Sequence, residues 1–239
     1  MTSPPRSAKL LFKSIVQNFR NSQSDFDDVH KRVVSLLVEI QQQCSAVHSY
    51  RTRIKDPDHL MDKLERRWRK LSEKRKKFDV TEKNYRFVLN DLIGARILHL
   101  HTRQFEEINN AIRTSLGRDA RKWKILRNRP EAKVWDPEYK RYFKELGLKN
   151  VEQDVYTSVH YEISIPIRWA ELPYTFELQV RTLAEELWGE TDHQINYPKK
   201  TSRLALREQL QALARSTSAC TRLVDSIMKT RGEHPASAE

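Results

Sequence analysis

The sequence predicts an α+β fold, built as one domain with helical segments at both ends. Apolar residues at helical spacing come first, strands mixed with helices follow, and a polar helix closes the chain. A chain of 239 residues is long enough for one substantial core with helical additions. We therefore divide it into an N-terminal extension (residues 1–24), a central domain (25–200) and a C-terminal helix with its tail (201–239).

The first half of the chain is predicted to contain two helices, a strand and a third helix. Apolar residues recur at helical spacing over residues 25–48, with Asp25 as the candidate N-cap. A second helix begins after Asp56, because this capping residue is followed by proline at the first helical position. The stretch ARILHL (95–100) has the character of a short strand, and a helix follows over 104–115.

In the second half of the chain, predicted strands and helices follow one another less regularly. Residues 118–129 form a basic segment with a strand-like KWKIL inside it, and residues 130–150 are expected to be loop with some helix. Thr182 and Glu185 have the spacing of a capping box, which predicts that a helix starts there. The remaining predicted elements are two strands and a polar helix, over 155–165, 174–180 and 202–229. The final HPASAE has the composition of a disordered tail.

Composition favours a globular protein with polyanionic partners. The net charge is +12 and the pI is near 9.7, which favours nucleotides, nucleic acid or an acidic surface as partners. A solvated surface rich in Lys and Arg is the plain alternative. Cys44 and Cys220 lie in no CxxC motif, so we expect free thiols in a reducing compartment. Since the chain shows neither a signal peptide nor a membrane span, we expect a cytoplasmic protein that does not contact a membrane.

The stretch FELQVR is apolar on one face of its predicted strand and polar on the other. The polar side chains are a carboxylate, an amide and a guanidinium: Glu177, Gln179 and Arg181. The helix that follows places two more carboxylates and an imidazole on one face: Glu186, Glu190 and His193. This second set could hold a metal, but it lacks a recognised metal spacing, so hydrogen-bonded support or substrate contact is favoured. The alternation of apolar and polar residues alone is compatible with either a solvent-exposed polar face or a polar face that lines an active site.

A second polar face is predicted in VYTSVHYEI. An extended strand would place Tyr156, Ser158 and His160 on one side. A ring, a hydroxyl and an imidazole in a row could stack on a base and bond its sugar or phosphates. The alternative is an edge strand whose polar face is simply solvated.

Four cations gather around the start of the second helix. Arg53 and Lys55 precede the helix, and Lys63 and Arg66 lie three residues apart within it. With the helix dipole they could grip a triphosphate, although basic helices are also common as solvated surfaces.

The stretch NDLIGARILHL offers a carboxylate and a guanidinium. Asp91 could bind Mg²⁺ and Arg96 a phosphate. Residues five apart fall on opposite faces of a regular strand, so both would serve one site only if a bulge intervened. Gly94 lies between them, where a bulge is easiest to form.

The signatures of P-loop, Rossmann, zincin and α/β-hydrolase proteins are absent from the sequence. What remains is a pair of carboxylates, Asp91 and Glu177, together with cations and a stacking aromatic ring. That set suits phosphoryl-type transfer, in which catalysis consists mostly of positioning and charge neutralisation.

Four stretches of the chain, taken in order, resemble the synthetase domain of the RelA/SpoT family. They are RIK with the following Lys and Arg, DLIGARI, YTSVH, and ELQVRTLAEELWGETDHQINY. The likeness covers residues 51–197. It implies a mixed β-sheet flanked by helices, related to nucleotidyltransferases. It also implies a pyrophosphokinase that moves the β,γ-pyrophosphate of ATP to the 3′-hydroxyl of GDP or GTP, which makes the alarmone (p)ppGpp.

The resemblance also implies roles for individual residues. ATP would be held by five cations: Arg53, Lys55, Lys63, Arg66 and Arg96. Mg²⁺ would be bound by Asp91 and Glu177, and Glu177 would help to deprotonate the attacking hydroxyl. Tyr156 would stack on the acceptor base. The other residues expected on the acceptor side are Ser158, His160, Gln179, Arg181, Glu186 and His193.

The chain resembles the small stand-alone synthetases of the family, and it departs from the family pattern in two places. Val155 stands where the family usually has glycine before the stacking tyrosine, and about a dozen extra residues, many basic, precede DLIGARI. A toxic branch of the family pyrophosphorylates the 3′-CCA end of tRNA instead. In that case the basic residues within 74–77 and 118–129 would bind the phosphates of the tRNA backbone. A module that only binds nucleotides is a third possibility. A homo-oligomer, an antitoxin and an allosteric effector are compatible with the sequence and are not decided by it.

Overall fold

The computed structural model describes residues 3–118, 122–126, 130–197 and 200–233. The helices are α1 (Arg6–Asn21), α2 (Gln23–Gln43), α3 (Pro57–Glu73), α4 (Tyr85–Val88), α5 (Gln104–Leu116), α6 (Pro137–Glu145), α7 (Leu183–Asn196) and α8 (Leu204–Glu233). The strands are β1 (Ser49–Ile54), β2 (Ile93–His99), β3 (Lys124–Ile125), β4 (Glu131–Val134), β5 (Asn150–Gln153), β6 (Ser158–Ile165) and β7 (Tyr174–Thr182).

The strands form one mixed sheet in the order β1-β2-β7-β6-β4-β5, with β3 paired to β6 off this path. The pairs β2–β7 and β4–β5 are parallel, and the remaining pairs are antiparallel. This confirms the predicted α+β fold and the mixed sheet flanked by helices. It also places β2 and β7, which carry the two candidate carboxylate motifs, directly beside each other.

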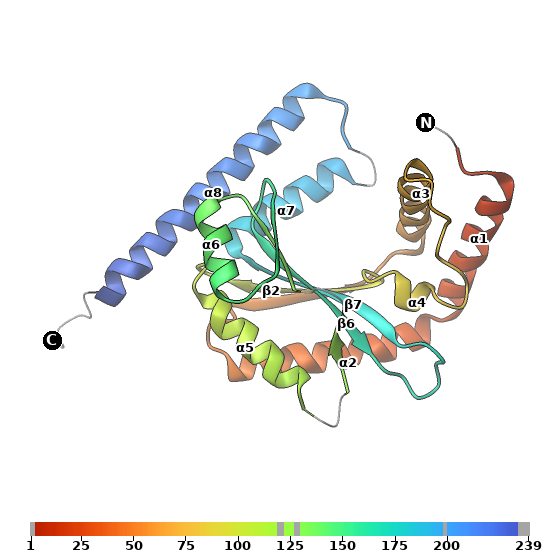
Figure 1. Cartoon of the computed structure of the whole chain (residues 1–239), viewed down its shortest axis with the longest axis horizontal. Coiled ribbons are helices and arrows are strands. Elements are labelled where there is room, and N and C mark those ends of the chain that lie inside the picture. Colours follow the sequence, from red (N-terminus) through yellow and green to blue (C-terminus); the bar gives the residue numbers. More distant parts are fainter. Residues whose placement is uncertain (1–2, 119–121, 127–129, 198–199, 234–239) are drawn as a thin grey trace.

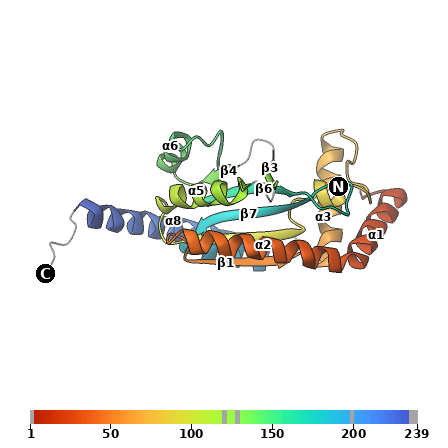
Figure 2. The same ribbon diagram turned by 90° about the horizontal axis from the view of Figure 1, so that it is seen from below.

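Helices cover the two faces of the sheet unequally. Helices α2 and α5 run side by side across one face, whereas α7 lies over the other face with α8 packed beyond it (Figures 1 and 2). In β7 the apolar side chains of Phe176, Leu178 and Val180 are buried in the main core. Because neighbouring side chains of a strand point to opposite faces, the polar side chains of β7 point toward α7. The predicted alternation therefore separates the core from a polar cleft.

Two helix starts follow the predicted capping chemistry and one does not. The Asp56 carboxylate accepts from the backbone N–H of Asp58 at 2.7 Å and caps α3. Thr182 Oγ1 accepts from the backbone N–H of Glu185 at 3.2 Å and caps α7, whereas the Glu185 carboxylate accepts from Ser218 and does not complete the reciprocal half of the capping box. Helix α2 has Ser22 at its N-cap, and Asp25 lies in its first turn, so the prediction of Asp25 as the cap is wrong. The Asp25 carboxylate still complements the dipole at this end of the helix.

Several elements escaped the sequence analysis. Helix α1 buries Phe12, Ile15, Val16 and Phe19 and packs against α3 inside residues assigned to an extension. Strand β4 lies within residues 130–150, where only loop and helix were expected, and β5 begins at the end of that stretch, at Asn150. These strands are four residues each, too short to show a period of two clearly. The division at residues 24 and 200 stays a prediction, and the HPASAE tail lies outside the described residues.

Strand β6 corrects the prediction for residues 155–165. It begins at Ser158, and its register pairs it with β7 on one side and β4 on the other. It is therefore an interior strand whose eight residues are all buried, not an edge strand with a solvated face. Tyr156 precedes the strand, so strand alternation does not place it on the same face as His160.

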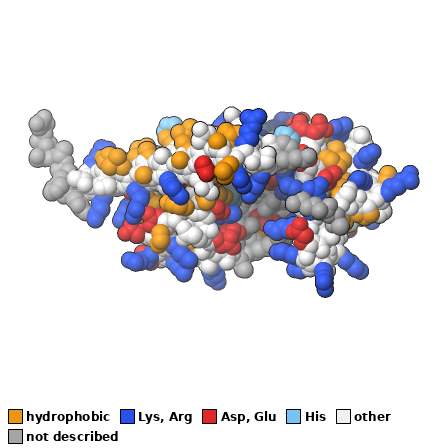
Figure 3. Space-filling view, turned by 90° about the horizontal axis from the view of Figure 1, so that it is seen from above, with side chains coloured by type: hydrophobic (Ala, Val, Ile, Leu, Met, Phe, Trp, Pro, Cys, Tyr) orange, Lys and Arg blue, Asp and Glu red, His pale blue; other side chains and the backbone are white. Residues whose placement is uncertain are grey.

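The described residues contain no helix that is both long enough and apolar enough to cross a membrane. Cys44 is buried and Cys220 is exposed, and both are free thiols as predicted. Face-on to α7 and α8, Lys and Arg side chains are interspersed with Asp and Glu, without one continuous basic field (Figure 3).

Candidate active site

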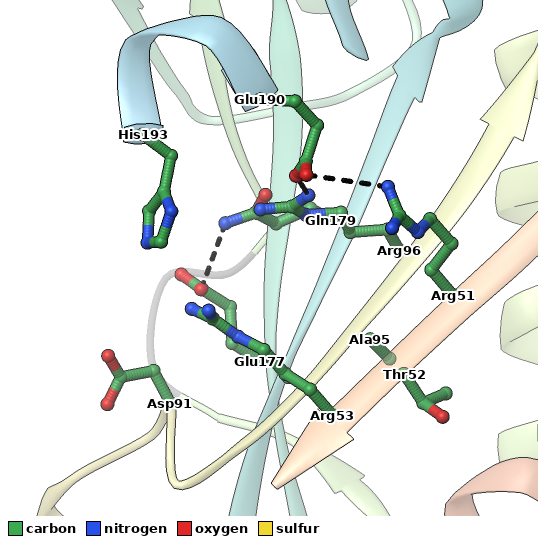
Figure 4. Close-up of a pocket in the computed structure, with 11 residues that line it drawn as sticks. Arg51, Thr52, Arg53, Asp91, Ala95, Arg96, Glu177, Gln179, Glu190 and His193 are labelled. Atoms are coloured by element: carbon green, nitrogen blue, oxygen red, sulfur yellow. Dashed lines mark hydrogen bonds and ion pairs between the residues drawn. The ribbon is translucent and has the colours of Figure 1, made fainter. Parts of the chain in front are cut away.

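A cavity of about 250 Å³ lies on the polar face of the sheet, below α7 (Figure 4). Its lining comes from β1, the start of β2, the middle of β7 and the last two turns of α7. The lining residues are Arg51, Thr52, Arg53, Asp91, Gly94, Ala95, Arg96, Glu177, Gln179, Glu190 and His193. Six of the sequence-predicted site residues are in this set: Arg53, Asp91, Arg96, Glu177, Gln179 and His193.

The two candidate metal-binding carboxylates both line this cavity, Glu177 from β7 and Asp91 from the segment just before the neighbouring strand β2. The parallel register pairs Gly94 with Glu177, and Asp91 lies just before β2 begins. The registers of β2 with β1 and with β7 run without interruption through Gly94, so the predicted bulge is wrong. Asp91 reaches the same site as Arg96 because it precedes the strand, where alternation does not apply.

Two lysines flank Asp91. Lys55 Nζ lies 3.2 Å from one carboxylate oxygen, and Lys63 contacts the other. Burial alone would raise the pKa of Asp91, but the charges of Lys63 and Lys55 outweigh it and lower that pKa. Asp91 is therefore ionised, and its negative charge holds both predicted phosphate-binding lysines beside a residue that lines the cavity.

Glu177 is also held in its ionised form. His160 Nδ1 lies 3.3 Å from Glu177 Oε1, and Gln179 Nε2 donates to Oε2 at 3.0 Å. Burial opposes ionisation, but His160, Lys63 and Gln179 together lower the pKa of Glu177 to about 2. Two ionised carboxylates facing one cavity provide the oxygen ligands that Mg²⁺ takes. No group of three His, Cys, Asp or Glu side chains in the described parts of the chain could hold a metal. A magnesium ion here would therefore take its other ligands from water and substrate phosphates.

The carboxylates of α7 hold arginines. Glu186 Oε1 lies 3.1 Å from Arg96 Nη1 and 3.5 Å from Arg51 Nη1, while its Oε2 lies 3.3 Å from Arg181 Nη1. Glu190 pairs with Arg96 and lies 3.5 Å from Arg51. These ion pairs fit the interpretation as hydrogen-bonded support, and the described residues hold no group of three side chains that could bind a metal here. The acceptor-side roles of Glu186 and His193 stay predictions.

A hydrogen-bonded row runs along the polar face of β7. Arg181 donates to Gln179 Oε1, and this contact leaves the amide nitrogen of Gln179 to donate to Glu177. The amide oxygen and nitrogen are thus assigned by their neighbours. Arg181 is only 6% exposed, so it acts through Gln179 and does not line the cavity.

Arg66 does not line the cavity and instead approaches an aromatic ring at the end of α7. Its guanidinium carbon lies 5.1 Å from the centre of the Tyr197 ring, and Lys55 Nζ approaches the same ring at 5.9 Å. The imidazole of His193 stacks on Tyr197 at 4.5 Å. Arg66 and the cavity-lining His193 therefore meet through one aromatic ring.

The predicted acceptor-side residues occupy different environments. Ser158 is buried and its hydroxyl donates to the Val180 carbonyl at 3.4 Å, so this hydroxyl links β6 to β7 within the sheet. Tyr156 stacks on Trp188, with ring centres 4.9 Å apart, and lies 6.4 Å from the His160 ring. Lys133 Nζ approaches the Tyr156 ring at 5.9 Å.

Three residues near the site were missed from the sequence. Arg51 lines the cavity, and the alternation in RTRIK, which puts it on the face of Arg53, was an available signal. Lys133 and Trp188 gave no local signal, because β4 and the packing of α7 on the segment before β6 depend on distant parts of the chain.

Comparisons with known proteins agree with this geometry. The family model described as "Region found in RelA / SpoT proteins" matches residues 52–202, well over half of the chain. A comparison with curated protein sequences finds no significant match.

Three solved structures illustrate the structural likeness. Small alarmone synthetase 1 from Bacillus subtilis is 17% identical, with a TM-score of 0.57 over 89% of this chain and 97% of that one. The same synthetase bound to its product pppGpp is 18% identical, with a TM-score of 0.52 over 87% and 90%. A GTP pyrophosphokinase family protein from Streptococcus pneumoniae is 16% identical, with a TM-score of 0.60 over 91% and 98%. At these identities the structures establish a shared fold. Together with the family match, they show that the chain belongs to the RelA/SpoT family.

Proposed function

We propose that this chain is a pyrophosphokinase that transfers the β,γ-pyrophosphate of ATP to the 3′-hydroxyl of GDP or GTP. The observation that carries the proposal is the pair of ionised carboxylates, Asp91 and Glu177, facing one cavity rimmed by cations. Among the similar structures, small alarmone synthetase 1 is found bound to pppGpp and, with a TM-score of 0.51 at 16% identity, to AMPCPP over 92% of this chain and 97% of that one.

In the proposed reaction the cavity neutralises and orients the phosphates. Arg53 and Arg96 line it and would contact the ATP phosphates, with Lys55 and Lys63 held beside them by Asp91. Asp91 and Glu177 would bind Mg²⁺, which would neutralise charge that develops on the transferred group.

Glu177 would also accept the hydrogen bond of the attacking 3′-hydroxyl. With a pKa of about 2 it remains an ionised acceptor over the physiological range, and by itself it is a weak base. His160, 3.3 Å from Glu177, holds that carboxylate toward the cavity. Tyr156 would stack on the acceptor base, beside Lys133.

The competing acceptor is the 3′-CCA end of tRNA. The net charge of +12 favours it, and Val155, 39% exposed, alters the segment next to the stacking tyrosine. Parts of the basic segment proposed to contact tRNA, residues 119–121 and 127–129, lie outside the described residues.

A parallel transfer assay would test both acceptors. ATP labelled with ³²P in its γ-phosphate is incubated with Mg²⁺ and with GDP, GTP, ATP or deacylated tRNA. Label in a guanosine nucleotide supports the proposal, label on tRNA alone establishes the competing function, and transfer to none of them refutes both. Replacing Glu177 with Gln should abolish transfer and leave ATP binding intact. A steep loss of acceptor binding with salt would indicate tRNA, because many phosphates release counterions.

A further inference from the structure

The inner side of α7 connects helix α8 with the segment that carries Tyr156. Trp188 is 8% exposed, and its indole lies nearly parallel to the Tyr156 ring, at 22° and 4.9 Å. Its Nε1–H donates to the Leu210 carbonyl of α8 at 3.1 Å. One side chain therefore contacts the proposed acceptor-stacking ring with its face and α8 with its edge.

Glu185 makes the same connection one turn earlier. It is 1% exposed, and its Oε1 accepts from Ser218 Oγ of α8 at 3.2 Å. The backbone N–H of Thr157, the residue after Tyr156, also acts on this carboxylate and opposes the rise of its pKa. The bond from Ser218 would survive in a glutamine, whose amide oxygen also accepts, and it would be lost in an alanine.

We propose that Trp188 and Glu185 are positioning residues that fix Tyr156 for acceptor binding by tying its segment to helix α8. The inference rests on the proposed function, because it assigns Tyr156 to the acceptor side of that reaction. The residues act through Tyr156 and Thr157 and do not contact the reacting groups.

The connection matters because Tyr156 lies outside the sheet. Ser158, two residues further on, opens β6 and is fixed by its pairing with Lys133 of β4, whereas Tyr156 precedes the strand and has no strand partner. An unheld ring would spend much of its time in orientations that cannot stack on a base. The apparent affinity for the acceptor falls by the fraction of molecules in the competent state. Among the described residues, the ring contacts of Tyr156 are with Trp188, His160 and Lys133 and involve no cavity-lining cation of β1 or β2, so ATP affinity should change little.

Steady-state kinetics with each substrate varied in turn would test the inference. We expect Trp188→Ala and Glu185→Ala to raise the acceptor KM by about tenfold, while the KM for ATP changes by less than about twofold. Glu185→Gln should restore the acceptor KM. Ser218→Ala should raise it by about threefold, whereas Ser216→Ala, an exposed position on the same helix, should leave it unchanged.

The outcomes separate this inference from the proposed function. If the wild-type chain transfers label to no acceptor, the proposed function itself fails. If it is active and the alanine variants leave the acceptor KM unchanged, or raise both KM values equally, the positioning role is refuted. Should an alanine variant not fold, Ser218→Ala and Trp188→Phe carry the test. The phenylalanine keeps an aromatic ring next to Tyr156 and loses the bond to Leu210 together with part of the indole's packing, so a smaller, acceptor-specific effect is expected.

Discussion

The buried carboxyl of Glu185 should make stability depend on pH in a predictable direction. Burial raises its pKa from 4.5 to about 7, despite the opposing effects of the Thr157 backbone N–H, Ser218 and the charge of Arg181. Each pKa unit corresponds to about 1.4 kcal/mol, so the difference between the folded and unfolded states is worth about 3 kcal/mol.

The sign follows from which state holds the proton. Below pH 4.5 Glu185 is protonated in both the folded and the unfolded chain, and it does not change their balance. Between pH 4.5 and 7 the unfolded chain releases the proton and the folded chain keeps it, so the free energy of unfolding falls as pH rises. Above about 7 the full loss is present and stays constant.

Urea unfolding of the wild type and of Glu185→Gln between pH 5 and pH 8 would measure this effect. The glutamine retains an acceptor for the Ser218 hydroxyl and cannot ionise. Its stability relative to wild type should therefore increase with pH by about 2 to 3 kcal/mol and then level off. Glu208→Gln, at an exposed position on α8, controls for the loss of a charge. A difference between wild type and Glu185→Gln that is the same at every pH would refute the reasoning.

Three further predictions concern the site and the core. A β-carbon at Gly189 would collide with the Arg181 guanidinium, so Gly189→Ala should disturb the contacts that orient Glu177 and lower kcat by about tenfold; an unchanged kcat in the transfer assay would contradict this. Asp91→Asn removes the charge that pairs with Lys55, whose side chain is 3% exposed. It should abolish Mg²⁺-dependent transfer and lower the free energy of unfolding, measured in urea, by about 2 kcal/mol. A variant with full activity would refute the assignment of Asp91 as a metal ligand. Phe19→Ala should cost about 3 to 5 kcal/mol because this fully buried ring packs α1 into the core; a loss below about 1 kcal/mol would show that α1 is dispensable.

Local chemistry explains which elements the sequence predicted. The Asp56-Pro57 pair and the Thr182 cap satisfy backbone N–H groups within a few residues, so their signals are complete in the sequence. The alternation of β7 is equally local, and it correctly separated the buried Leu178 from the cavity-lining Gln179. Family motifs supplied the identities of the candidate carboxylates, and their roles stay predictions.

The misses share one physical cause, which is that they depend on distant partners. Strands β4 and β5 pair with each other and β4 with β6, and so short a strand is stable only within a sheet. The bulge expected at Gly94 assumed that Asp91 belongs to the strand, whereas β2 starts two residues later. Where the ladder begins is set by pairing with β1 and β7, and not by the composition of DLIGARI.

By itself, then, the sequence determined the fold class, the two capped helix starts and the residue types available for chemistry. Each of these depends on a short motif or on the spacing of apolar residues within one stretch of the chain. Only the tertiary structure decided which groups meet. The parallel pairing of β2 with β7 brings Asp91 and Glu177 to one cavity, and the packing of α7 assigns Glu186 to the arginines and Trp188 to Tyr156. Such contacts arise when separate elements bury their apolar faces on one another, and no single stretch of sequence encodes them.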